Sequence, residues 1–154
     1  MFVPGDPRFD EMLLLADWAS GKGLLDHMRP RWRELVTLML GSISEEFSQR
    51  RQHLRAATEL RVELVAPDEV KSLVTSTIGS GGLSFKLPEP LPLGTPVELA
   101  IRLEGRPSPL PARAQVVWNH NGYVGVAFID LFQNDREVLE GLAVKALLAQ
   151  AAAG

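Results

Sequence analysis

The sequence predicts a mainly β fold: a six-stranded antiparallel β-barrel with an N-terminal helical extension and a C-terminal helix. Three observations lead to this prediction. Apolar residues recur at helical spacing up to residue 47, the period changes to two from Glu59 onward, and helical spacing returns after Asn134. Six short runs of period two joined by close turns are typical of a closed barrel. We therefore expect a helical segment at 1–47 and a barrel with its C-terminal helix at 48–154.

The N-terminal segment carries two helix patterns. Asp6 precedes Pro7, which is the combination of an N-cap and a first-turn proline that starts a helix, and Gly21 and Gly23 end it. The apolar face of this helix comprises Phe9, Met12, Leu13 and Ala16. The second helix is expected to open at Pro30, and its apolar stripe comprises Trp32, Leu35, Val36, Met39, Leu40, Ile43 and Phe47. Such a stripe packs either on the barrel or against a second copy of the chain.

The β region is read from period-two alternation and from its turns. Strands are expected at 60–65, 70–78, 83–87, 97–103, 112–118 and 123–129. The glycine-rich residues 79–82 form a tight connection, and Asn121-Gly122 is a strong hairpin signal. Asn134 is expected to cap the final helix, with Glu137 completing a capping box.

Composition excludes several classes of function. The net charge of −3 argues against a nucleic-acid binder held by bulk electrostatics, so neither DNA nor RNA is an expected partner. The absence of cysteine removes disulfides, thiolate zinc sites and cysteine nucleophiles. His27, His53 and His120 are scattered, so we expect no metal site and no cofactor. No catalytic spacing is found, so we do not expect an enzyme.

Location follows from the apolar runs. No apolar stretch reaches membrane-spanning length, and the first residues lack a basic leader followed by an apolar run. We therefore expect a cytoplasmic protein.

An arginine cluster, Arg50, Arg51 and Arg55, stands just ahead of the β region. Arginine presents a planar fork of donors that suits phosphate oxygens and the O6/N7 edge of guanine. Three of them beside a small barrel indicate a local site for an anionic, guanine-bearing ligand. The alternative is a solvated helix face, on which Glu46 and Arg50 would form a supportive i,i+4 pair.

Taken with the barrel pattern, these residues resemble the PilZ family of bacterial cyclic di-GMP receptors over roughly residues 48–148. The Arg-x-x-x-Arg motif matches Arg51 and Arg55, with Arg50 in front. The Asp/Asn-x-Ser-x-x-Gly motif aligns with residues 77–82, starting at Thr77 and ending at Gly82. The resemblance implies that the arginines grip phosphates and guanine edges and that the second motif contacts a guanine from the barrel surface.

Two positions depart from the family pattern. Thr77 stands where Asp or Asn is expected, and Gly79 stands where Ser is expected. A hydroxyl offers one oxygen where a carboxylate offers two, and glycine offers no side chain. Losing both contacts would cost roughly 2–4 kcal/mol, on the order of 30- to 1000-fold in affinity. Backbone N–H groups of residues 79–82 could recover part of this.

Two hypotheses follow from the resemblance. In the first, the chain binds cyclic di-GMP through Arg50, Arg51, Arg55, Thr77, Gly79 and Gly82, and binding repositions the helical segment and changes its protein contacts. In the second, the barrel no longer binds the ligand, and the helices act as a docking or homodimerisation surface. His53 is expected in an exposed loop, and Trp118 is expected on the barrel core.

Overall fold

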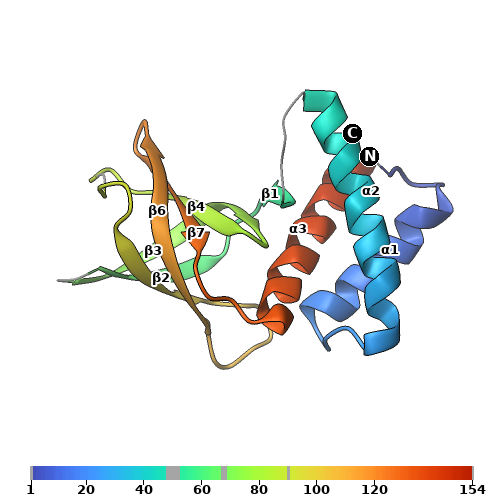
Figure 1. Cartoon of the computed structure of the whole chain (residues 1–154), viewed down its shortest axis with the longest axis horizontal. Coiled ribbons are helices and arrows are strands. Elements are labelled where there is room, and N and C mark those ends of the chain that lie inside the picture. The colour runs from blue at the N-terminus through green and yellow to red at the C-terminus, as the bar shows by residue number, and fades with distance from the viewer. Residues whose placement is uncertain (1, 48–52, 67–68, 90, 154) are drawn as a thin grey trace.

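A computed structural model describes residues 2–47, 53–66, 69–89 and 91–153 of the chain. It consists of a β-barrel and a body of three helices, with α3 lying between the barrel and the other two helices (Figure 1). The helical elements are α1 (Pro7–Ser20), a short 3-10 turn (Asp26–Met28), α2 (Arg29–Phe47) and α3 (Gln133–Ala153). The strands are β1 (Arg55–Ala57), β2 (Arg61–Ala66), β3 (Glu69–Gly79), β4 (Gly82–Lys86), β5 (Pro96–Ile101), β6 (Leu110–His120) and β7 (Tyr123–Phe128).

The predicted six-stranded antiparallel barrel is confirmed. Neighbouring strands follow the order β3-β2-β5-β6-β7-β4, and the pairing of β3 with β4 closes the ring. The structure adds β1, which pairs with the end of β3 through Arg55 opposite Gly79. The sequence analysis missed β1 because three residues are too few to show a period of two.

The hairpin between β6 and β7 follows from its two turn residues. Asn121 and Gly122 have φ angles of 52° and 82°. Two consecutive positive φ angles match the twist of an antiparallel hairpin, and Asn-Gly is the pair that adopts them at least cost. The sequence prediction of this turn is confirmed.

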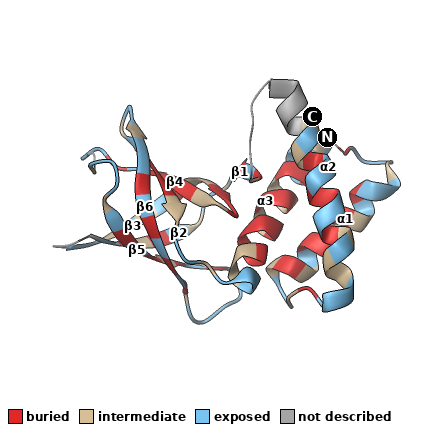
Figure 2. Cartoon of the chain, viewed as in Figure 1, coloured by how far each residue is buried: buried red, intermediate tan, exposed pale blue. Residues whose placement is uncertain are grey.

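The barrel interior is filled by alternate residues of each strand. Val97, Leu99 and Ile101 of β5 face inward and are buried, while the residues between them face outward. Val138 and Leu139 of α3 complete this core, and Figure 2 shows α3 with much of its ribbon in the colour of buried residues. Because α3 thereby belongs to the barrel core, the position of the helical body is tied to the barrel.

The helical body has its own core. Asp6 caps α1 by accepting a hydrogen bond from the backbone N–H of Arg8, as the sequence predicted. The predicted faces of α1 and α2 pack on α3, whereas the side chains of Ile43 and Phe47 lie outside the described residues. The buried residues of this core include Phe9, Met12, Ala16, Trp32, Leu35, Val36, Met39, Ala143, Val144 and Leu147.

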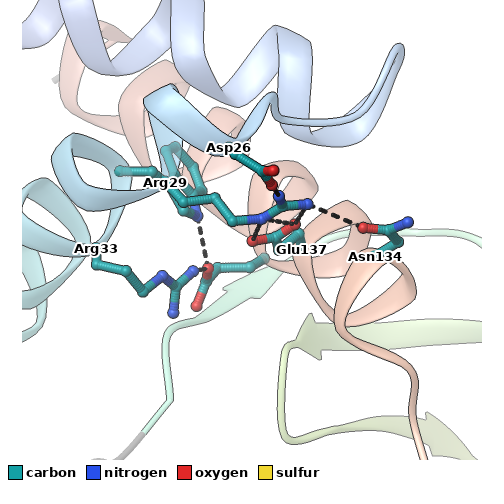
Figure 3. Close-up of polar contacts among 7 residues, drawn as sticks. Asp26, Arg29, Arg33, Asn134 and Glu137 are labelled. Atoms are coloured by element: carbon teal, nitrogen blue, oxygen red, sulfur yellow. Dashed lines mark hydrogen bonds and ion pairs between the residues drawn. The ribbon is translucent and has the colours of Figure 1, made fainter.

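Charged side chains lock α2 onto α3. Arg29 of α2 donates to Glu137 at 3.1 Å and to Asn134 at 3.0 Å, and it also pairs with Asp26 (Figure 3). The capping box predicted for Asn134 and Glu137 is therefore wrong. The helix already begins at Gln133, and both side chains bind a distant arginine.

A second contact sits one turn further along α3. The buried carboxylate of Glu140 accepts from the indole N–H of Trp32 at 2.7 Å and from Arg33. Each of these acceptors satisfies a donor from α2, so the two carboxylates together fix the register of the two helices.

Within the described ranges, none of the helices combines the length and the apolar character that crossing a membrane would require.

Candidate ligand-binding site

A shallow hollow lies on the outer face of the barrel, where β1, β3, β4, β6 and β7 meet. Its volume of about 40 Å³ holds only a few water molecules. A larger ligand would therefore lie across the hollow and not inside it. The lining residues are Arg55, Thr77, Gly81, Gly82, Leu83, Ser84, Val117, Trp118, Val126 and Ala127.

Arg55 is the predicted arginine that the structure places at the hollow. Its strand neighbour Ala56 is buried, so the alternation along β1 turns Arg55 outward, where its side chain is exposed. A guanidinium in this position can direct its fork of donors toward an anion bound on the barrel wall. Arg50 and Arg51, the other two arginines of the predicted cluster, lie outside the described residues.

The second predicted motif lies on β3 and β4, beside Arg55. Thr77 lines the hollow, and its hydroxyl shares a hydrogen bond of 2.6 Å with the hydroxyl of Ser84. Gly82 also lines it, and a Cβ at this position would collide with the backbone oxygen of Val126. The structure therefore brings Arg55, Thr77 and Gly82 together, although they come from three different strands.

Gly79 has a role that the sequence analysis did not anticipate. It lies under β1, not among the lining residues, and a Cβ there would collide with the backbone oxygen of Leu54. A serine would have to push β1 away from β3. The absence of the family's serine is thus a condition of the β1–β3 pairing, and Gly79 is not simply a binding residue that has lost its hydroxyl.

Trp118 is on the outside of the barrel, so its predicted place on the core is wrong. Strict alternation along β6 buries Ala112, Ala114 and Val116 and would turn residue 118 inward. A register shift between Val116 and Trp118 interrupts this alternation, and Trp118 is 38% exposed. A β-bulge of this kind re-aims the side chains that follow it, and no feature of the sequence announces it.

The indole of Trp118 covers Gly125 of the neighbouring strand, where any Cβ would collide with the ring. This close packing against Gly125 holds the indole on the barrel wall at the edge of the hollow. A flat aromatic surface in such a position can stack on a planar base.

A second arginine approaches the β3–β4 connection from α3. Arg136 donates to the backbone oxygen of Ser80 at 3.0 Å. The imidazole Nδ1 of His53 lies 3.1 Å from the Ser80 hydroxyl, which is buried. His53 is half-buried against Gly81 and is not the exposed loop histidine that the sequence predicted. No pattern in the sequence indicates Arg136, because only tertiary packing brings α3 to this turn.

The electrostatics of this corner are positive. Burial, and then the charges of Arg136 and Arg55, lower the pKa of His53 below its usual 6.5. The imidazole therefore tends to stay neutral beside the two guanidinium groups. The result is a local cationic region on a chain whose net charge is −3. In the part of the chain that the structure describes, no group of acidic residues and histidines could hold a metal ion.

Comparison with known proteins agrees with this architecture. The family model for the PilZ domain matches residues 49–145. The comparison with curated proteins finds no match.

The fold is shared with several solved structures, among them a Bacillus subtilis protein and an Escherichia coli domain. The Bacillus subtilis inhibitor of motility, MotI/DgrA, is similar with a TM-score of 0.59 and 21% identity over 66% of this chain, which spans 53% of that protein. The PilZ domain of YcgR from Escherichia coli, solved with c-di-GMP, has a TM-score of 0.52 and 14% identity, covering 64% of this chain and 92% of that one.

Proposed function

The chain belongs to the PilZ domain family, and from that premise we propose that it is a cyclic di-GMP receptor and adaptor. In this proposal, ligand binding changes the contacts that the chain makes with a protein partner. The observation that carries the proposal is the meeting of Arg55, Thr77 and Trp118 at one hollow on the barrel wall. The YcgR domain that was solved with c-di-GMP has the same barrel fold, which supports the choice of ligand.

Each of these side chains suits one part of a cyclic dinucleotide. Arg55, joined by Arg50 and Arg51 from the preceding segment, would bind the phosphates or the O6/N7 edge of a guanine. The indole of Trp118 would stack on a base, which contributes about 1–3 kcal/mol. Thr77 would give a single hydroxyl contact in competition with its bond to Ser84.

The link to the helices runs through both ends of the site. Residues 48–54 join α2 to Arg55, so drawing the arginines onto the wall would pull on the end of α2. Arg136 ties the β3–β4 connection to α3, which in turn holds α2 through Glu137 and Glu140. Binding would therefore bias how the helical body is held, which is a switch driven by local charge.

The surface that would meet a partner is proposed to be the helical body. Leu14 of α1 and Leu38 of α2 are both exposed apolar side chains on that body. They offer a docking face for a protein partner or for a second copy of the chain, which would form a homodimer.

The second candidate function is an adaptor that has lost the ligand. Two observations favour it: the Thr77 hydroxyl is already bonded to Ser84, and β1 leaves no room for a side chain at Gly79. In that case the barrel would serve only to present the helices.

Titration calorimetry of cyclic di-GMP at physiological salt tests the first proposal. Arg55→Ala and Arg51→Ala should each weaken binding by about 10- to 150-fold, the value of a charge-assisted hydrogen bond. Arg61→Ala is the matched control, because Arg61 is exposed on β2 and does not line the hollow. If neither Arg55→Ala nor Arg51→Ala changes the affinity for cyclic di-GMP, the ligand does not bind at this hollow, and the proposed site is wrong.

Thr77→Asp separates the two candidate functions. It restores the carboxylate of the family motif on β3 without touching Gly79, and Thr77→Val is its control. A gain of about tenfold in affinity, the value of one added hydrogen bond, would show a competent but weakened receptor. No detectable heat from either the wild type or Thr77→Asp would favour the adaptor.

A further inference from the structure

An exposed phenylalanine marks a different part of the barrel wall. Phe132 lies in the connection from β7 to α3 and is 81% exposed. Burying a phenylalanine side chain contributes roughly 1.5–3 kcal/mol, yet here the ring stands in water. Ile129 in the same connection and Val65 at the end of β2 are exposed as well. Three large apolar side chains therefore stand in water on this side of the barrel.

These side chains line two adjoining hollows. The first, of about 500 Å³, is lined by Phe132, Val65 and Pro111 among others. The second, of about 370 Å³, contains Ile129 and shares Val65 with the first. Together they form a groove, called here the Phe132 groove, whose size is in the range of sites that hold a ligand or a short peptide.

The Phe132 groove is separate from the candidate nucleotide site. Its walls come from β2, β5, β6, the connection after β7 and the start of α3, and among the described residues it shares no lining residue with the hollow at Arg55. In the closed order of the barrel, β5 is three strands away from β4 in either direction. An occupant of the groove would thus leave the Arg55 hollow open.

The charges around the groove are mostly negative. Among the described residues that line it, Glu98, Asp130 and Asp135 stand against a single guanidinium, that of Arg113. Arg113 is 3.6 Å from Asp130, so its charge is offset within the rim. An acidic rim repels anionic lipid and nucleic acid, and it attracts lysine and arginine.

We propose that the Phe132 groove docks a short segment of a protein partner whose apolar side chains are flanked by lysine or arginine. Phe132, Ile129 and Val65 would contact the apolar side chains, and Glu98 and Asp135 would face the basic ones. The match of an apolar floor with an acidic rim is what selects this occupant over a lipid surface.

Two synthetic peptides test the proposal by fluorescence anisotropy with the full chain. One is an amphipathic leucine/lysine peptide, and the other is the same peptide with glutamate in place of lysine. The lysine peptide should bind at least tenfold more tightly than the glutamate peptide, and added salt should reduce the difference. Equal affinity of the two peptides would overturn the proposal.

Variants locate the binding on the groove. Phe132→Ser should weaken the lysine peptide at least tenfold, whereas Leu93→Ser, which removes an exposed leucine that lines neither hollow, should not. The double variant Glu98→Lys/Asp135→Lys should reverse the preference in favour of the glutamate peptide. Phe132 and Glu98 are exposed and Asp135 is half-buried, so unchanged melting temperatures are needed to show that the variants remain folded.

The same variants also test two other occupants of the Phe132 groove: a second copy of the chain and a membrane surface. If the wild type sediments as a dimer and Phe132→Ser sediments as a monomer, the groove belongs to a second copy, which overturns the proposal. If the wild type binds phosphatidylglycerol vesicles and Phe132→Ser does not, the groove contacts a membrane, which also overturns it. Lysine-peptide binding that is sensitive to Phe132→Ser, without either result, supports it.

Discussion

The two walls of the barrel differ in charge, in shape and in how tightly they are packed. At the β3–β4 connection, Arg55 and Arg136 form a cationic corner, and backbones approach so closely that only glycine fits at residue 79. Around β5, Glu98 and Asp135 border an open apolar groove beside Phe132. In a closed barrel every strand turns alternate residues outward, so each wall can acquire its own chemistry while the interior stays the same.

The two walls also differ in what a substitution can do. On the cationic wall, the side chains pack closely against neighbouring backbone. Most substitutions there should therefore change both the stability of the fold and the affinity for the ligand. On the acidic wall, the side chains stand in water, so changes there should affect only association. The effects expected below test this contrast between the two walls, beginning with α3, which contacts both of them.

The largest effect is expected at α3, which contributes residues to both walls. Glu140→Ala should lower the free energy of unfolding by roughly 2–4 kcal/mol, because it leaves the indole N–H of Trp32 buried without an acceptor. This loss of stability is smaller than that expected for breaking a fully buried ion pair, because Arg33 is half-exposed. Urea denaturation measures the change in the free energy of unfolding. Glu34→Ala, which removes an exposed carboxylate from α2, is the control and should change stability by less than about 1 kcal/mol.

Trp118→Ala tests the division of labour between the walls. Loss of the stacking surface should weaken cyclic di-GMP by about 5- to 150-fold. Phe132→Ala, on the opposite wall, should leave that affinity unchanged. Titration calorimetry of both variants provides the measurement, and a similar loss of affinity in both would show that the walls are coupled.

Gly79→Ser tests the close packing under β1. The added Cβ must displace the backbone of Leu54, so we expect a loss of about 1–3 kcal/mol of stability and no gain in ligand affinity. Gly41→Ser is the matched control, because Gly41 lies on α2 with nothing near its Cβ position. A stable Gly79→Ser protein with improved binding would contradict this account of the position.

The smallest effect concerns pH. The folded pKa of His53 lies below its usual 6.5, so the unfolded chain binds the proton more readily. The corresponding stability is present above about pH 6.5 and is lost as the pH falls through that value toward the folded pKa. Urea midpoints at several pH values between 7.5 and 5 should fall less steeply in His53→Gln than in the wild type. His120→Gln, on the exposed β6–β7 hairpin, is the comparison variant, and identical slopes for wild type and His53→Gln would refute the assignment.

Features set by neighbouring residues could be predicted from the sequence. Asp6 caps α1 and Asn121-Gly122 turns the hairpin, because each acts on the backbone within a few residues of itself. The strands β2, β5 and β6 follow from their period, because burial alternates along most of their length.

Features set by distant residues could not be predicted. Asn134 and Glu137 have the spacing of a capping box, but Arg29, more than a hundred residues away, takes both side chains. Trp118 has the phase of a core residue until a bulge reverses it. Arg136 reaches the candidate site only through the packing of α3. The candidate site was therefore found by its motif residues, while its aromatic and its second arginine came from the structure.

Near its beginning, α3 carries Asp135, Arg136 and Glu137 in succession. They face, in that order, the Phe132 groove, the backbone of Ser80 and the side chain of Arg29. Consecutive residues of an α-helix point about 100° apart, since 3.6 of them complete a turn. Three consecutive residues of one helix therefore contact three separate surfaces. A rotation of α3 about its own axis would displace all three side chains at once.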